Sequence, residues 1–181
     1  MGKNIITVCA VFFTVCFMYF CSAEDMASAQ PESGPGTVAE EAAPAVQDKY
    51  DFSDLSSWNL TVSAWEKMAE KDYEGVAAYT DKCFSVYNDE AGRIAAEMRK
   101  FAGPGHEDDY AVVNDVATCH YILGETYMRL GKNDDAVREF EIVIKEYPYA
   151  QCWDPKGWFW KVADISKTNI AKIRKAGVKG K

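Results

Sequence analysis

Few residues in this chain have the types and spacings that metal chemistry requires. The 181 residues include two histidines, His106 and His120, and neither belongs to a set of ligands at metal-binding spacing. Cys119 precedes His120, but neighbouring residues of a helix point about 100° apart and cannot easily share one ion. The acidic loop 106–109 lacks the central glycine of a calcium-binding loop. We therefore expect no metal site.

The cysteines do not form a redox motif either. Three of the six cysteines lie in the apolar N-terminal segment, which leaves Cys83, Cys119 and Cys152. An odd number permits at most one internal disulfide, and whether one forms stays open. No pair has the Cys-x-x-Cys spacing of thiol oxidoreductases or zinc ribbons. Buried small hydrophobic residues on helix faces are the simpler interpretation of Cys83 and Cys119.

Acid–base catalysis has only general support. The chain holds 28 Asp and Glu, enough to supply the carboxylate pair of a glycoside hydrolase. None of them stands at a strand end or in a cleft that the sequence identifies. We expect no catalytic residues, no enzymatic activity and no cofactor.

The stretch 147–160 is unusually aromatic. It contains two Tyr, three Trp and one Phe, whereas aromatic residues make up 13% of the chain. One interpretation, which we favour, is a hydrophobic lid at the end of a short helical stack. The other is a surface that stacks on a glycan or anchors a partner, through Trp153, Trp158 and Trp160. One helix cannot bury six rings, so part of the cluster should stay exposed.

The apolar periodicity predicts helices throughout and no strand pair. Asp72, Asn133 and Asp154 are suited to cap helix N-termini, and Gly131 to end a helix in the left-handed conformation. Gly103-Pro104-Gly105 should interrupt the chain. The expected helices span residues 60–71, 73–87, 90–101, 112–130 and 134–146, with a sixth opened by Asp154-Pro155.

The fourth and fifth predicted helices resemble a tetratricopeptide repeat, a helical hairpin of about 34 residues. The small residues Gly124 and Ala136 stand where the two helices of such a repeat cross closely. His120 stands where Trp is common in the family. The matching positions are Leu123, Gly124, Tyr127, Ala136, Phe140 and Pro148.

A second, degenerate copy lies upstream. Residues 71–76 resemble the turn and the start of the second helix of a repeat. Between Val76 and its equivalent Ala136 lie 60 positions, so an insertion of about 26 residues should bulge from the stack. The resemblance covers residues 57–150, and residues 151–175 are interpreted as a capping helix. The predicted fold is all-α, a short helical-hairpin solenoid.

The resemblance implies a concave face that binds a peptide or partner protein, and no catalysis. Some repeats of this family clamp a terminal carboxylate with Lys and Asn, a role that Tyr121 and Glu125 do not fit. The positions that the resemblance places on the concave face are Thr118, Tyr121, Glu125, Met128 and Arg129, with Trp58, Thr61, Trp65 and Met68 in the degenerate copy.

The N-terminus has the pattern of an export signal. Lys3 precedes an apolar run over residues 5–20 and then small residues, which predicts a signal peptide at 1–29. Cleavage after Ala23 or after Ala29 stays open, and an uncleaved membrane anchor is the alternative. Lipidation at Cys21 is disfavoured by the residues before it. We expect an exported protein of the periplasm or cell envelope, of the small bacterial type.

Composition completes the predicted organisation. A Pro- and Gly-rich, disordered linker is expected at 30–53, the helical domain at 54–175 and a basic tail at 176–181. A net charge of -8 disfavours nucleic acid as a partner. The sequence thus predicts a non-catalytic adaptor that binds a peptide or partner protein. The alternative is an envelope glycan-binding protein or hydrolase that uses the aromatic cluster, and the oligomeric state stays open.

Overall fold

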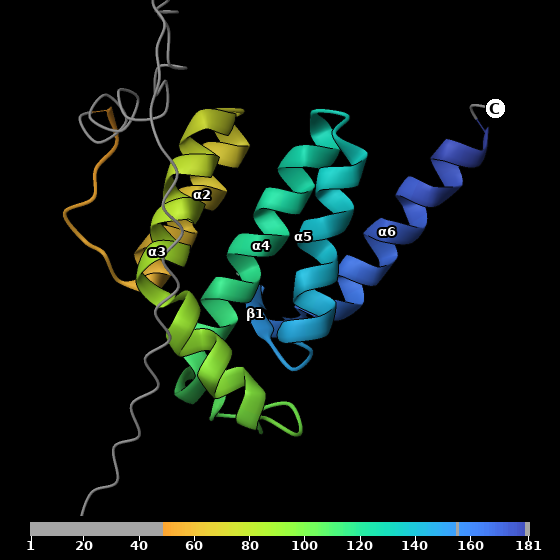
Figure 1. The fold of residues 1–181 in the computed structure, drawn as a ribbon. Coiled ribbons are helices and arrows are strands. Elements are labelled where there is room, and N and C mark those ends of the chain that lie inside the picture. Colours follow the sequence, from red (N-terminus) through yellow and green to blue (C-terminus); the bar gives the residue numbers. More distant parts are fainter. Residues whose placement is uncertain (1–48, 155, 180–181) are drawn as a thin grey trace, which may run out of the picture. The chain divides into compact units, whose positions relative to one another are not determined.

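The computed structural model describes residues 49–154 and 156–179, which fold into helices and one small hairpin (Figure 1). The expected signal peptide and most of the expected linker lie outside these residues. The elements are α2 (Ser57–Glu70), α3 (Tyr73–Glu97), the short 3-10 helix η1 (Glu107–Tyr110), α4 (Ala111–Arg129), α5 (Asn133–Glu146), β1 (Gln151–Asp154), β2 (Trp158–Lys161) and α6 (Val162–Lys179).

The helices pack in chain order. α2 and α3 form one hairpin and α4 and α5 form a second, while α4 also packs against both α2 and α3 (Figure 1). α6 packs mainly on α5 and touches α4. The architecture is therefore mostly helical, as expected, with one β-hairpin that the periodicity did not predict.

The turn between α2 and α3 follows from its sequence. α2 ends at Lys71, which adopts the left-handed conformation at φ 63°. The Asp72 side chain then accepts a hydrogen bond from the Gly75 amide at 3.0 Å, so the predicted cap of α3 is confirmed. Because this cap satisfies a free amide of the first turn, α3 begins immediately after the turn.

α3 is one helix of 25 residues, so the expectation of two helices, over 73–87 and 90–101, is wrong. The polar residues Asn88 and Asp89 are exposed, and they can continue a helix without any burial cost. Ala91, Ala95 and Met98 are buried in the core. α3 therefore extends past the end of α2 (Figure 1) with one side packed on the core. We expected this segment to bulge from the stack.

α4 and α5 cross closely at Gly124. A Cβ atom at this position would lie 2.7 Å from Cε1 of Phe140, closer than any real contact. Phe140 and Ala136 are fully buried, which seals this side of α4. Gly131 has φ 72° and ends α4 as predicted, whereas Asn133 is the first helical residue of α5 and not its cap.

The sixth predicted helix is present as α6, but its predicted start at Asp154-Pro155 is wrong. β1 and β2 pair antiparallel here, with Cys152 opposite Trp160. Gly157 has φ 94° and its amide donates to the Asp154 carbonyl oxygen at 2.8 Å. A glycine in this conformation suits a hairpin turn, and the aromatic run that follows suits a strand. α6 consequently begins at Val162.

Packed structure extends past both expected domain boundaries. Tyr50 is buried and its hydroxyl donates to the Asp72 carboxylate at 3.1 Å. The Tyr79 hydroxyl donates to the Asp51 carbonyl oxygen at 3.2 Å. The end of the expected linker therefore packs on α3, and α6 continues to Lys179, into the expected tail.

Candidate functional site

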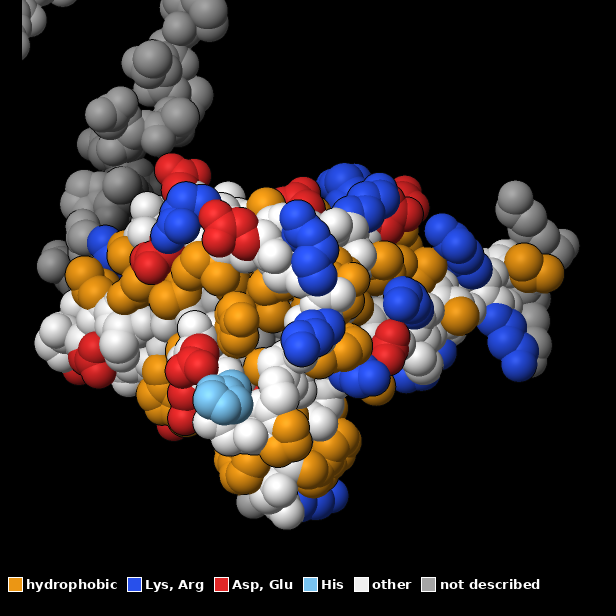
Figure 2. Space-filling view, turned by 90° about the horizontal axis from the view of Figure 1, so that it is seen from below, with side chains coloured by type: hydrophobic (Ala, Val, Ile, Leu, Met, Phe, Trp, Pro, Cys, Tyr) orange, Lys and Arg blue, Asp and Glu red, His pale blue; other side chains and the backbone are white. Residues whose placement is uncertain are grey.

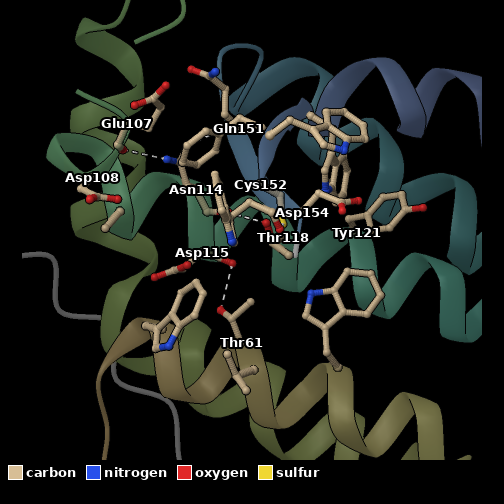
Figure 3. Close-up of a pocket in the computed structure, with 18 of the residues that line it drawn as sticks. Thr61, Glu107, Asp108, Asn114, Asp115, Thr118, Tyr121, Gln151, Cys152 and Asp154 are labelled. Carbon is tan, nitrogen blue, oxygen red and sulfur yellow. Dashed lines mark hydrogen bonds between the residues drawn. The ribbon is translucent and has the colours of Figure 1, made fainter. Parts of the chain in front are cut away.

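One face of α4, together with α2, η1 and the hairpin, encloses an open groove of about 1120 Å³. α2 supplies one wall, the hairpin the other, and α4 lies between them. Figure 3 shows Thr61 of α2 on one side of the α4 residues Asp115 and Thr118, and Gln151 of β1 on the other. Three separate segments of the chain therefore build this site.

The walls of the groove are aromatic. The chain contains five tryptophans, and every one of them lines this groove. The Tyr121 ring lies between two of them, 5.2 Å from Trp160 and 6.1 Å from Trp65 between ring centroids. Trp58 and Trp158 keep 57% and 52% of their surface exposed. The groove thus has an aromatic floor and two indoles at its open edge.

The hairpin divides the aromatic stretch 147–160. Tyr147 is buried behind α4, where its ring stacks on His120 at 5.9 Å. Trp153 and Phe159 stand opposite each other across the strands, with ring centroids 5.1 Å apart. The stretch therefore closes the core at one end and lines the groove at the other, and part of it stays exposed, as expected.

Asn114 connects the two ends of the groove wall. Its Nδ2 donates to the Glu107 carbonyl oxygen at 3.1 Å, and its Oδ1 accepts from the Gln151 amide at 2.8 Å. One buried side-chain amide thereby joins α4 to η1 on one side and to β1 on the other (Figure 3). These hydrogen bonds position the hairpin over the groove.

Asp115 is a buried acid at the base of the groove. Only 7% of its surface is exposed, and its Oδ2 accepts a hydrogen bond from the Ser57 hydroxyl at 2.6 Å. Burial raises the pKa of Asp115 to about 6, although the hydrogen bond from Ser57 acts in the opposite direction. The carboxyl group is therefore mostly ionised at neutral pH and becomes neutral in mildly acidic solution.

The lining of the groove is acidic. It contains five carboxylates and no Lys, Arg or His. Throughout the part of the chain that the structure describes, none of these five carboxylates lies within ion-pair distance of a basic side chain. The five are Glu66, Glu107, Asp108, Asp115 and Asp154.

The structure brings together most of the predicted binding residues. Trp65, Thr118 and Tyr121 line the groove, and so do Trp153, Trp158 and Trp160. Sequence reasoning assigned the first three to a concave face and the last three to a separate aromatic surface. Both sets belong to one cavity.

Three predicted residues of α4 lie outside the groove lining. Glu125 accepts hydrogen bonds from the Tyr121 hydroxyl at 3.0 Å and from Asn169 of α6 at 2.6 Å. Met128 and Arg129 follow it toward the end of α4 and are absent from the lining. α6 packs along this end of α4, so the groove ends near Tyr121. Burial raises the pKa of the Tyr121 hydroxyl well above its usual value.

Sequence reasoning missed Asn114 and Asp115. Both stand in a predicted helix whose neighbouring residues are Val112, Val113, Val116 and Ala117. A pair of polar residues in such an apolar run was the available signal, because buried polar groups need partners. Periodicity alone did not say that these two side chains face another helix and a strand.

Of the remaining chemically competent residues, His120, Cys83 and Cys119 are buried in the core, whereas Cys152 lines the groove. His120 lies in the core, stacked on Phe84 at 4.1 Å, with its Nδ1 2.7 Å from Glu139 Oε2. Cys83 and Cys119 are fully buried free thiols, and burial raises the pKa of Cys152 to about 11. Among the residues that the structure describes, no cluster of His, Cys, Asp or Glu could hold a metal ion.

No family model, curated protein or solved structure matches this chain. Within residues 49–154 and 156–179, no helix has the length and apolar character to cross a membrane. What the groove can bind therefore has to be argued from its own residues.

Proposed function

We propose that the protein is a non-catalytic binding module that takes a peptide or a segment of a partner protein in this groove. The observation that carries the proposal is the convergence of all five tryptophans on one cavity. Tryptophan is enriched among the residues that dominate protein–protein binding energies. A cluster of exposed aromatic side chains in a hollow is also typical of an interaction site.

The helix arrangement supports a tetratricopeptide-like architecture as part of this proposal. α2 and α4 are the first helices of two successive hairpins, and both face the groove. In the resembling family the first helices line the concave face. The close approach of Gly124 to Phe140 fits the small residue that the repeat needs at its helix crossing.

The setting of the carboxylates favours binding over catalysis. Asp115 is held by the Ser57 hydroxyl, and the Glu107 and Asp154 side chains accept from the backbone amides of Gly105 and Lys156. None of the three is hydrogen-bonded to a histidine that could act as a base in the described part of the chain. Together with the N-terminal export pattern, this supports an adaptor in the cell envelope.

Glycan binding is a second candidate, favoured by the exposed rings of Trp153 and Trp158. Indole faces stack on sugar rings, and carboxylates accept hydrogen bonds from sugar hydroxyls. Crosslinking separates the two candidates, because a bound peptide partner would give a protein adduct and a bound glycan would give retained polysaccharide.

Site-specific photocrosslinking of the full chain tests the proposal. A photoreactive residue at position 158, at the groove edge, is compared with one at position 130. Leu130 is also a large exposed residue, but it does not line the groove. We expect a protein adduct from position 158 that is absent from position 130, and that weakens with Trp65→Ala. Retained envelope polysaccharide with no protein adduct at position 158 would overturn the adaptor proposal in favour of glycan binding.

A further inference from the structure

No basic side chain among the described residues neutralises the negative charge of the groove. Elsewhere acids of the described part pair with bases, such as Glu74 with Lys49 and Glu141 with Lys145. In the groove, five carboxylates stand with no basic residue in the lining. Of the five, Asp115 is the one removed from water, and an opposite charge beside a buried carboxylate stabilises its ionised form. A bound molecule that brings positive charge would supply that partner.

Asp115 is the acid best placed to meet such a charge. Its Oδ2 is hydrogen-bonded to Ser57, and its Oδ1 receives no hydrogen bond within the described part of the chain. The residue nevertheless lines the cavity, so this oxygen has room for a donor from outside. An ammonium or guanidinium group here would form a charge-assisted hydrogen bond in a site that excludes much of the water.

The indoles around the acids suit the rest of a cationic side chain. Lys and Arg carry long apolar stems that lie along hydrophobic surface while their charged ends reach polar groups. Trp is also the best aromatic partner for a cation. Trp58 and Trp65 come from the same helix, α2, as the Ser57 that holds Asp115. Two indoles of α2 thus line the same groove as Asp115 of α4.

We propose that the occupant of the groove is a basic amphipathic segment of a partner protein, in which Lys or Arg alternates with apolar residues and one cationic side chain reaches Asp115. This inference rests on the proposed function and specifies the chemistry of the partner. At about 1120 Å³ the groove exceeds the roughly 300–1,000 Å³ of small-molecule sites, which favours a peptide segment over a small free amine.

The same charge excludes other partners. An acidic peptide or a chain end held by its carboxylate would add negative charge to a groove that has no base to receive it. The chain does carry basic residues elsewhere. Figure 2 shows Lys and Arg gathered toward the α6 end of the molecule, where Lys172, Arg174 and Lys175 are exposed. α6 of a second copy is therefore the competing occupant that the experiment has to separate.

Titration of the full chain with matched synthetic peptides tests the inference. One peptide alternates Lys with Leu and Phe, a second has Gln in place of each Lys, and a third has Glu. Tryptophan fluorescence reports binding directly, because every tryptophan lines the groove. We expect the Lys peptide to bind about tenfold or more tightly than the Gln peptide, and the Glu peptide to bind weakest. The difference should shrink as salt is raised.

Two variants locate the charge. Asp115→Asn keeps the size of the side chain and should weaken the Lys peptide about tenfold while leaving the Gln peptide unchanged. Asp89→Asn removes the same charge from an exposed position of α3 outside the groove and should have no effect. Glu107→Gln, at the other end of the acidic lining, gives an independent measure should the Asp115→Asn variant fold poorly.

Three outcomes would overturn the inference, each in a different way. Equal binding of the Lys and Gln peptides would remove the charge argument and leave the groove as a peptide site. Crosslinking of only polysaccharide at position 158 would remove the proposed function as well. A concentration-dependent dimer, seen by sedimentation and dissociated by Asp115→Asn, would make a second copy of this chain the occupant.

Discussion

Two polar side chains on the same helix are buried to nearly the same extent and have opposite surroundings. His120 is 8% exposed and Asp115 is 7% exposed. His120 faces the closed side of α4, where Phe84 and Tyr147 stack on its ring and Glu139 contacts its Nδ1. Asp115 faces the groove, where a single hydroxyl reaches one of its oxygens.

The two sides of α4 therefore differ in role: one packs in the core, and the other lines the groove. On the closed side, His120 Nδ1 and Glu139 Oε2 are partners, 2.7 Å apart. On the open side, a carboxylate is buried at a cost that no cation within residues 49–154 and 156–179 offsets. Carboxyl groups in hollows whose pKa values are strongly shifted are often functional. For Asp115, the difference between the two sides of α4 gives a physical cause for the raised pKa.

Removing the Phe140 ring should disrupt the packing on the closed side of α4. Phe140→Ala should lower the free energy of unfolding by about 4 kcal/mol, because it leaves a cavity in a fully buried position against Gly124. Urea unfolding followed by circular dichroism measures the change. Leu130→Ala, on a side chain that is 44% exposed, should cost under about 1 kcal/mol. A similarly small loss for Phe140→Ala would show that this side is not a closed core.

Asp115→Asn should stabilise the protein at pH 8. The folded chain binds a proton at Asp115 up to about pH 6, whereas the unfolded chain loses it near the ordinary pKa of 3.8. The contribution of this group to the free energy of unfolding therefore falls as pH rises from about 4 to about 6. Above that window the ionised carboxylate costs the folded state about 3 kcal/mol, and the Asn variant avoids this cost.

Urea midpoints of wild type and Asp115→Asn across pH 4–8 check this expectation. The two curves should converge near pH 4 and separate through pH 6. Two thiols, those of Cys119 and Cys152, interact electrostatically with Asp115. Burial raises the pKa values of both thiols, so both stay protonated throughout this pH range. Parallel curves at all pH values would mean that folding does not raise the pKa of Asp115 above that of an exposed acid.

The smallest effect on stability is expected at the groove edge. Trp158 is 52% exposed, so Trp158→Ala should change the free energy of unfolding by under about 1 kcal/mol. The same variant should weaken the Lys peptide at least about tenfold, because exposed indoles at a binding site contribute mainly to binding. Paired unfolding and titration measurements separate the two effects. A large loss of stability with unchanged binding would place Trp158 in the fold and not in the site.

The sequence identified the parts of the fold that depend on local contacts. Asp72 begins α3 and Gly131 ends α4, both as predicted, because caps act within one turn of the chain. The hairpin was missed because Asp154-Pro155 is also a typical start of a helix, and only Gly157 with the strand pairing decides between the two.

The groove was only half predictable for a related reason. The repeat resemblance placed Trp65, Thr118 and Tyr121 on a concave face, but the contribution of the hairpin depends on pairing that periodicity does not reveal. The resemblance also predicted Glu125 for this face, and nothing in its own helix indicates that Asn169, 44 residues away, donates a hydrogen bond to it.

The hydrogen bonds of Asn114 have a consequence for how the molecule opens. Two strands of four residues are marginal by themselves, and this one amide joins their start to α4. The groove wall should therefore unfold locally at a lower free energy than the helices. In hydrogen exchange, the amides of the hairpin would lose protection before those of α4 and α5.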